Sequence, residues 1–146
     1  FAGGYLTPAS NIPTTGSATY TGKTAALVSY NNGEFLAPTD YWGNVELRAD
    51  FANRGITGAI TGLEWGEDRW GTFPLAIGID ANLDPAKNLF TGTTRVTAQQ
   101  GTSLFPLGTT GTITGRFFGP AAQEAGGVWT LDTGLQRLVG AFGVKQ

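Results

Sequence analysis

The residues of this chain that could do chemistry gather in one short stretch, residues 64–70. The stretch holds three carboxylates, one guanidinium and two indoles: Glu64, Trp65, Glu67, Asp68, Arg69 and Trp70. Neighbouring carboxylates can raise one another's pKa and serve acid–base chemistry. A glycosidase, however, needs two carboxylates that face each other across a cleft, and neighbours on one loop are poorly placed for that. Two other interpretations remain: a solvated loop whose indoles cover the end of the domain, and a contact surface with tryptophan anchors.

A second aromatic group, Tyr41 and Trp42, follows the turn-forming residues 31–33 and 38–40. An exposed aromatic pair favours a partner surface and a buried pair belongs to the core, and the sequence leaves both open. We expect the partner-facing surface to lie on loops, chiefly residues 31–42 and 64–73, because aromatic residues stand there beside turn formers.

The composition excludes most catalytic and metal-binding chemistry. The chain contains no His, no Cys and no Met. It therefore lacks the usual general base near neutral pH, the thiolate nucleophile and the commonest ligands of transition metals. The net charge of −2, without a basic stripe, argues against a nucleic-acid partner. We expect a protein that is not an enzyme and binds no transition metal.

Haem and calcium are the cofactors for which candidate ligands remain. A tyrosine phenolate can ligate haem iron, and the chain has four tyrosines: Tyr5, Tyr20, Tyr30 and Tyr41. Asp80, Asn82 and Asp84 resemble the start of a calcium loop, but Pro85 stands where such a loop needs Gly and Thr91 where it needs Glu. A hairpin turn in which Asp and Asn cap their own backbone explains the same residues. The expectation is no cofactor.

The elements that must position these residues are strands. Between residues 45 and 51, apolar residues alternate with Glu46, Arg48 and Asp50, which is typical of a strand with one buried face. Segments of this kind predict eight strands, near residues 18–30, 45–51, 56–62, 75–79, 89–92, 112–118, 128–131 and 138–142. Residues 80–88 are rich in turn formers, and residues 120–126 could form one helical turn or a packed loop.

An apolar residue followed by Thr-Gly recurs at Tyr20, Ile56, Ile60, Phe90 and Ile113. Glycine inside a strand marks a bend, a bulge or a close approach of another backbone, and a small barrel needs such points repeatedly. The sequence predicts one all-β domain over residues 1–146, an eight-stranded antiparallel up-and-down β-barrel with short hairpin loops. We expect residues 1–12 to be an extended N-terminal segment, and the strand of Phe142 to pair with the strand near Tyr20.

Several longer motifs are similar to a known family. Residues 13–22 resemble the strand that begins the β-barrel domain of transferrin-binding protein B, and residues 50–58 resemble its repeated hairpin. Residues 115–120, followed by Glu124, Gly126, Gly127 and Trp129, resemble its pattern Gly-x-Phe-x-Gly-Pro-x-Ala-x-Glu-x-Gly-Gly. Residues 139–145 resemble its closing strand. The similarity covers roughly residues 10–146.

This resemblance implies a barrel at the surface of a Gram-negative bacterium, or released from it, that grips a protein or a small ligand through barrel-end loops. The matched positions are scaffold, because binding residues in this family lie in variable loops. The chain starts at Phe1, so we expect a processed or excised form whose membrane anchor, if any, lies upstream, or membrane association through an outer-membrane partner. The alternatives are a structural subunit of a surface assembly and an integral outer-membrane barrel with inverted faces.

Overall fold

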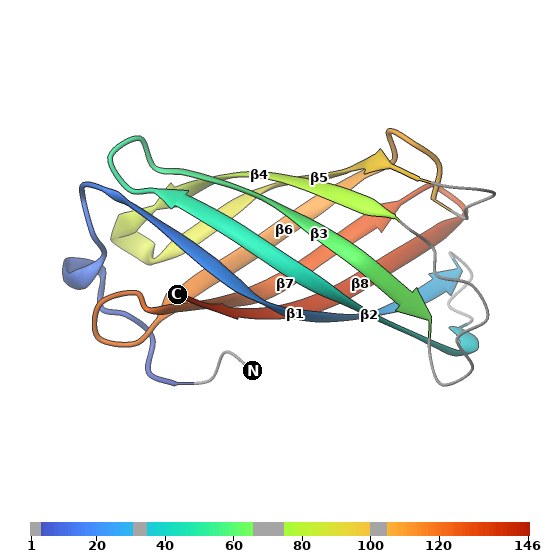
Figure 1. The fold of residues 1–146 in the computed structure, drawn as a ribbon, viewed down its shortest axis with the longest axis horizontal. Coiled ribbons are helices and arrows are strands. Elements are labelled where there is room, and N and C mark those ends of the chain that lie inside the picture. The colour runs from blue at the N-terminus through green and yellow to red at the C-terminus, as the bar shows by residue number, and fades with distance from the viewer. Residues whose placement is uncertain (1–3, 31–34, 66–74, 100–104) are drawn as a thin grey trace.

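Eight antiparallel strands close into one barrel in the computed structural model (Figure 1). The structure describes residues 4–30, 35–65, 75–99 and 105–146, without the side chains of residues 30, 35–40, 64 and 65. The strands are β1 (Ser17–Tyr30), β2 (Phe35–Asp50), β3 (Gly55–Trp65), β4 (Ala76–Asp84), β5 (Leu89–Ala98), β6 (Thr110–Phe118), β7 (Glu124–Asp132) and β8 (Gln136–Lys145). Each strand pairs with its neighbours in the chain, so the predicted up-and-down barrel is confirmed.

The first and last strands close the barrel. β1 and β8 pair from Thr21 opposite Lys145 to Tyr30 opposite Gln136, and Thr24 lies opposite Phe142. The predicted pairing of the Phe142 strand with the Tyr20 strand is therefore confirmed. Closure leaves the sheet without the unpaired edge that would template association with another chain.

Helical structure is confined to single turns in the described part of the chain. The two 3-10 helices are Ala9–Asn11 and Pro85–Lys87. Among the described residues, no helix has the length and apolar character needed to cross a membrane.

The inward faces of the strands form the core. On β2, Val45, Leu47 and Ala49 are buried while the residues between them are exposed, as the alternation predicts. Four aromatic side chains meet in the core: the ring centroid of Phe117 lies 5.5–5.7 Å from those of Tyr20, Phe51 and Phe90. Rings at this separation attract one another beyond the burial of their area.

The Thr-Gly repeat marks close contacts between neighbouring strands. A Cβ added to Gly22 would lie 2.0 Å from the carbonyl oxygen of Gly143, and one added to Gly58 would lie 2.1 Å from that of Glu46. Both glycines face inward, where the strongly coiled strands approach each other. The predicted close approach of another backbone is confirmed at these positions.

Several strands extend further than the sequence pattern indicated. β2 begins at Phe35, so residues 35–42 lie on a strand rather than in a loop. β4 continues to Asp84, because Ala81 and Leu83 keep pointing into the core where residues 80–88 suggested a turn. The turn itself is only the 3-10 helix and Asn88. β3 continues to Trp65, so Glu64 and Trp65 lie on a strand rather than in a loop, opposite Trp42 and Tyr41.

The N-terminal segment packs against one end of the barrel, named here the closed end, where the β2–β3, β4–β5 and β6–β7 turns lie. Buried Asn88 organises it: its Nδ2 donates to the carbonyl oxygens of Thr7 (3.0 Å) and Phe117 (2.8 Å), and its Oδ1 accepts from the backbone N–H of Phe117 (2.8 Å). The backbone N–H of Thr7 also donates to the Phe117 carbonyl at 3.0 Å. Residues far apart in sequence are joined here by fully paired polar groups.

Candidate functional site

A continuous apolar face covers the outside of β2, β1, β8 and β7. Four large apolar side chains are exposed on it, one from each strand: Trp42, Leu27, Val139 and Val128. The pairing places them together, because Leu27 lies opposite Val139, while Trp42, Ala25, Ala141 and Val128 form one row across the four strands. Exposed apolar residues scattered singly are ordinary, but a contiguous group marks a contact surface.

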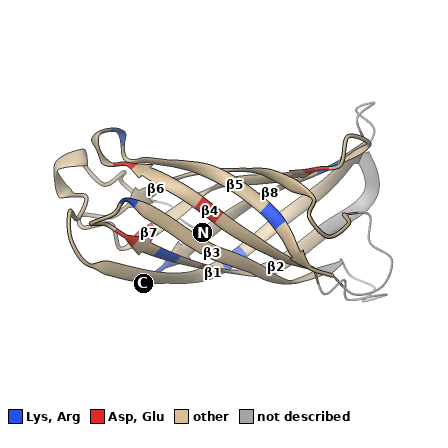
Figure 2. Cartoon of the chain, turned by 90° about the horizontal axis from the view of Figure 1, so that it is seen from above, with Lys and Arg blue, Asp and Glu red and all other residues tan. Residues whose placement is uncertain are grey.

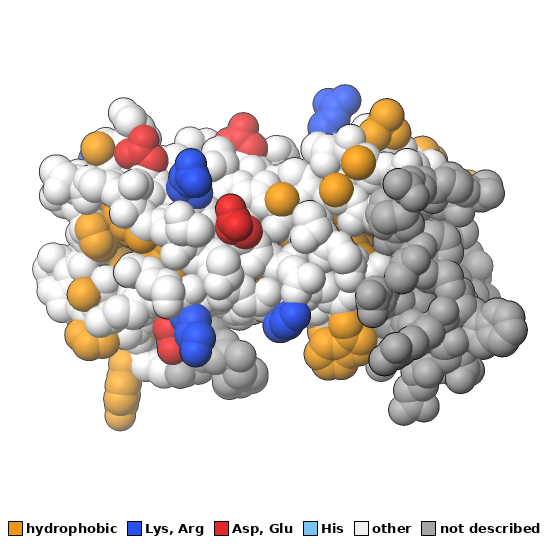
Figure 3. Space-filling model, viewed as in Figure 1, with side chains coloured by type: hydrophobic (Ala, Val, Ile, Leu, Met, Phe, Trp, Pro, Cys, Tyr) orange, Lys and Arg blue, Asp and Glu red, His pale blue; other side chains and the backbone are white. Residues whose placement is uncertain are grey.

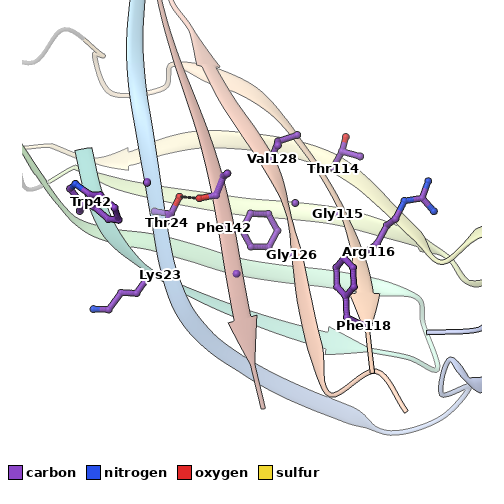
Figure 4. Close-up of a pocket in the computed structure, with 14 residues that line it drawn as sticks. Lys23, Thr24, Trp42, Thr114, Gly115, Arg116, Phe118, Gly126, Val128 and Phe142 are labelled. Atoms are coloured by element: carbon purple, nitrogen blue, oxygen red, sulfur yellow. Dashed lines mark hydrogen bonds between the residues drawn. The ribbon is translucent and has the colours of Figure 1, made fainter. Parts of the chain in front are cut away.

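This face is hollowed into a groove (Figure 4). Two adjoining hollows of about 680 and 370 Å³ share Ala25, Trp42, Val128 and Ala141 in their lining. The floor is low because small residues occupy it: Ala25, Ala141, Gly126 and Gly143. Trp42 rises on the β2 side and Val128 on the β7 side. On the side of the molecule seen in Figure 3, charged and apolar side chains are scattered among backbone and uncharged polar side chains.

Two cations flank the larger hollow, and none of its described lining residues is acidic. Lys23 and Arg116 belong to the same row of strand partners, Lys23 opposite Gly143 and Arg116 opposite Gly126. Lys23 donates to the amide oxygen of Asn44, and Arg116 Nη1 donates to the carbonyl oxygen of Lys87 at 3.1 Å. Over the described ranges the salt bridges are Lys87–Asp84 and Arg137–Asp132, so neither cation of the groove has a carboxylate partner there. Figure 2 shows how sparsely charge is spread over the strands.

The groove rests on a fixed interior. Directly beneath it, the indole N–H of Trp129 donates to the Thr24 hydroxyl at 2.8 Å, and that hydroxyl donates to the carbonyl oxygen of Ala141 at 2.8 Å. Trp129 and Thr24 are buried, so these hydrogen bonds hold β7, β8 and β1 together without competition from water.

The structure separates the two aromatic residues that the sequence grouped. Tyr41 points inward and is buried, whereas 59% of the Trp42 side chain is exposed on the groove. Glu64 and Trp65 lie on β3 beside this pair, but their side chains lie outside the described residues. Glu67, Asp68, Arg69 and Trp70 lie outside the described residues altogether.

The tyrosines named as haem ligands are dispersed. The Tyr20 hydroxyl donates to the Ala122 carbonyl oxygen at 2.6 Å and accepts from Gln146 Nε2 at 3.3 Å. Burial raises the pKa of Tyr20, against the hydrogen bond from Gln146, and burial also raises the pKa of Tyr41. Tyr5 is exposed at the N-terminal segment, and the Tyr30 side chain lies outside the described residues.

The calcium-like residues lie on the outer face of β4. Asp80 and Asn82 point outward, two residues apart along one strand. The Asp84 carboxylate accepts from the backbone N–H of Ala86 at 3.1 Å and lies 3.5 Å from Lys87 Nζ. Asp84 therefore caps its own turn, as the hairpin interpretation predicted. No group of three or more acidic side chains in the described ranges is arranged to hold a metal ion.

Sequence reasoning missed the groove. Several of its lining residues, among them Gly115, Arg116, Gly126 and Gly127, belong to the motif that was interpreted as scaffold. A signal was present in the outward residues: β1 carries Ala25 and Leu27, and β8 carries Val139 and Ala141, where polar residues are expected on an outer face. Only the register of β1 against β8 brings these positions together.

Comparison with known proteins gives a consistent result. The family described as the C-lobe and N-lobe beta barrels of Tf-binding protein B matches residues 12–146. A comparison with curated protein sequences finds no significant match.

Among solved structures, the chain is similar to a variant of the vaccine antigen transferrin-binding protein B from Haemophilus parasuis Hp5, with 25% identity and a TM-score of 0.67 over 97% of this chain and 28% of that one. The chain is 24% identical to isotype 1 transferrin-binding protein B from serogroup B Neisseria meningitidis, with a TM-score of 0.65 over 96% of this chain and 28% of that one. It is 19% identical to the N-lobe of lactoferrin-binding protein B from Moraxella bovis, with a TM-score of 0.63 over 90% of this chain and 60% of that one. The last two show the fold alone, and the chain spans 28% of the length of the first two proteins.

Proposed function

The chain belongs to the family of C-lobe and N-lobe beta barrels of Tf-binding protein B, and from this premise we propose that it is a non-catalytic module that binds a partner protein at the bacterial cell surface. The relatives are named for binding transferrin and lactoferrin, which are proteins. We extend only this class of partner to the present chain.

The observation that carries the proposal is the exposed apolar face around Trp42. Side chains such as Trp42 and Leu27 cost free energy when they remain in water, and burying them against a partner recovers about 25 cal/mol per Å² of apolar surface. Tryptophan is also the residue type most enriched among the anchors of protein interfaces. We assign Trp42 to the partner surface, together with Trp65 and Trp70, while Tyr41 serves the core.

Binding to immobilised barrel protein tests this function. We expect saturable binding of transferrin or lactoferrin, with serum albumin as the control protein, measured by biolayer interferometry. Trp42→Ala is expected to weaken binding by more than about 1 kcal/mol, roughly 5-fold, while the melting temperature stays unchanged because the side chain is exposed. Leu135→Ala is a matched control, since Leu135 is also exposed but lies in the β7–β8 turn, away from the groove. The proposal would be contradicted if the barrel bound neither transferrin nor lactoferrin and also bound no other plasma protein when each was tested singly.

Trp65→Ala and Trp70→Ala extend the test to the residues chosen from the sequence. Each is expected to lower affinity by more than about 1 kcal/mol with little change in melting temperature. If the loss of binding merely follows a loss of stability, these tryptophans belong to the core.

The distribution of charge does not favour an integral outer-membrane barrel. Such a barrel turns apolar side chains toward lipid and polar ones inward. Here the inward faces form the apolar core, while Glu46, Arg48, Asp80, Arg95 and Arg137 lie on the outer faces of the strands.

Mass measurement of the purified protein separates binding from a role as an assembly subunit: a monodisperse monomer favours binding, and a ring or filament favours assembly.

A further inference from the structure

We propose that the groove between Trp42 and Arg116 takes an extended acidic segment of a partner protein, in which an apolar side chain lies between two acidic ones. The apolar side chain lies over Ala141, Gly143 and Gly126, and the two carboxylates pair with Lys23 and Arg116. This rests on the proposed function only in that the occupant is part of a protein.

The charges of the groove define the chemistry of the occupant. The described lining of the larger hollow has two cations and no acid, although the chain as a whole has a net charge of −2. Arg116 offers five N–H donors in a planar fork, and the hydrogen bonds to Lys87 and Asn88 both use Nη1. The other donors of the guanidinium are available for a carboxylate, which such a fork matches well. The Lys23 ammonium group donates its hydrogen bond to the neutral amide of Asn44.

The spacing of the two cations defines the pattern. Lys23, Gly143, Gly126 and Arg116 are successive partners on β1, β8, β7 and β6. Neighbouring strands lie about 4.8 Å apart, so about 14 Å of sheet separates the Cα atoms of Lys23 and Arg116. Their charged groups lie farther apart, because Lys23 reaches toward Asn44 on β2 and Arg116 toward Lys87 in the β4–β5 turn. An extended segment rises about 3.3 Å per residue, so its two carboxylates stand at least four residues apart. Alternate residues of such a segment face the same way, so an apolar side chain between the two carboxylates meets the glycines.

The floor suits this middle side chain. The glycines at the centre of the row have no side chain, and Ala25 and Ala141 have only a methyl group. The exposed indole of Trp42 and the Val128 side chain stand on either side of this floor. An aromatic or large aliphatic side chain over the glycines therefore lies beside Ala141 and Val128 of the neighbouring row, which is an apolar setting for an interface anchor.

Two other occupants fit the same groove less well. In a two-fold dimer the same surface of each copy meets the other, so Lys23 and Arg116 would face a groove that contains the same cations. A fatty acid has an apolar chain but one carboxylate, and it leaves the second cation without a partner.

A displayed peptide library tests the pattern. Ten-residue peptides carry Trp between two Glu that stand four, six or eight positions apart, with the other positions randomised. They are selected on the immobilised protein and compared with the same library carrying Gln in place of both Glu. We expect enrichment only of the acidic library. The affinity of the enriched peptide, synthesised with a fluorescein label, is then measured by anisotropy.

Four variants locate the binding. Lys23→Gln and Arg116→Gln should each lower the affinity of the labelled peptide about 5-fold, the upper range for an exposed ion pair. Ala141→Leu fills the groove and should lower this affinity more than about 10-fold. The matched controls are Arg48→Gln and Thr57→Leu, paired with each other on the outside of β2 and β3 away from the groove, and both should leave affinity unchanged. Circular dichroism melts establish that each variant is folded.

Several results would overturn the inference. They are the absence of any enriched peptide, equal enrichment of the Gln library, and a peptide affinity that Lys23→Gln, Arg116→Gln and Ala141→Leu leave unchanged in folded protein. A dimer abolished by Ala141→Leu in sedimentation, or displacement of the peptide by oleate at a similar concentration, would assign the groove to a second copy or to a fatty acid. If the peptides fail while the barrel still binds transferrin or lactoferrin, the groove assignment falls and the proposed function stands.

Discussion

Thr24 and Trp129 are joined by a hydrogen bond inside the barrel, although 105 positions separate them in the chain. The hydroxyl of Thr24 accepts from the indole and donates to Ala141 on the strand between them, so both of its hydrogen-bonding roles are used. The contact makes the closure of the barrel specific, because any other register of β1 against β8 would leave a buried indole N–H unpaired.

We expect Thr24→Val to lower the free energy of unfolding by about 1–3 kcal/mol, because the shape is kept while the indole N–H loses its acceptor. Urea unfolding followed by tryptophan fluorescence measures the change. Thr24→Ser keeps the hydroxyl and is the control. Equal stability of Thr24→Val and the parent protein would show that the hydrogen bond contributes nothing net.

Asn88 is predicted to hold the N-terminal segment against the closed end. Its backbone is left-handed, with φ +46°, and its side chain makes three buried hydrogen bonds. Asn88→Gly keeps the favourable backbone but removes the side chain, so it separates the two contributions. We expect a loss of about 2–4 kcal/mol and faster hydrogen exchange at the Thr7 amide. Asn88→Ala should cost more, since alanine adds the strain of a positive φ. A loss in Asn88→Ala that Asn88→Gly fully restores would assign the whole effect to the backbone.

Gly22→Ala is expected to prevent correct closure, because its Cβ would lie 2.0 Å from the carbonyl oxygen of Gly143 and backbone cannot easily move aside. The expected loss of stability is about 3 kcal/mol or more, at the upper end for overpacking. Gly55→Ala is the matched control, since nothing lies within 4 Å of the added atom. Thermal melts of both variants decide the question, and equal melting temperatures would contradict the prediction.

The buried tyrosines predict a loss of stability at alkaline pH. The pKa of Tyr20 and that of Tyr41 are raised by burial, so the folded protein keeps both phenols protonated while the unfolded chain ionises near pH 10. Their contribution is therefore complete below pH 10 and is lost as pH rises toward the higher values of the folded state. Urea midpoints between pH 8 and 12 should fall more steeply for the parent protein than for Tyr20→Phe. Tyr5→Phe, at an exposed side chain, should leave the slope unchanged.

The fold was predictable because local pattern and global architecture agree in this chain. Strict alternation on β2 and the Thr-Gly repeat each follow from the pleat of a coiled strand, and both are visible in a few residues. The same reasoning stopped β4 too early at residue 80, although Ala81 and Leu83 continue the alternation through the turn-forming Asp80 and Asn82. Turn propensity was given more weight than periodicity there, and the buried face decided the structure.

The groove was not predictable from the sequence, because its parts meet only through pairing of the two ends of the chain. Ala25 and Ala141 each look like a small residue in an ordinary strand, and neither reveals that the other lies beside it. That Tyr41 lies in the core and Trp42 on the surface was easier to predict, since neighbours on a strand point to opposite faces. Taking them as a pair hid the one exposed anchor that the structure describes on β2.

The pairing of the first and last strands also determines how the barrel responds to mechanical load. Thr21 lies opposite Lys145, so the start of β1 and the end of β8 emerge at the same end of the molecule. A force applied through both ends would separate the two strands from that end, breaking their hydrogen bonds one after another rather than all at once. A force that acts through only one end of the chain does not pull β1 and β8 apart. The barrel is therefore mechanically weakest when a force pulls on both of its ends.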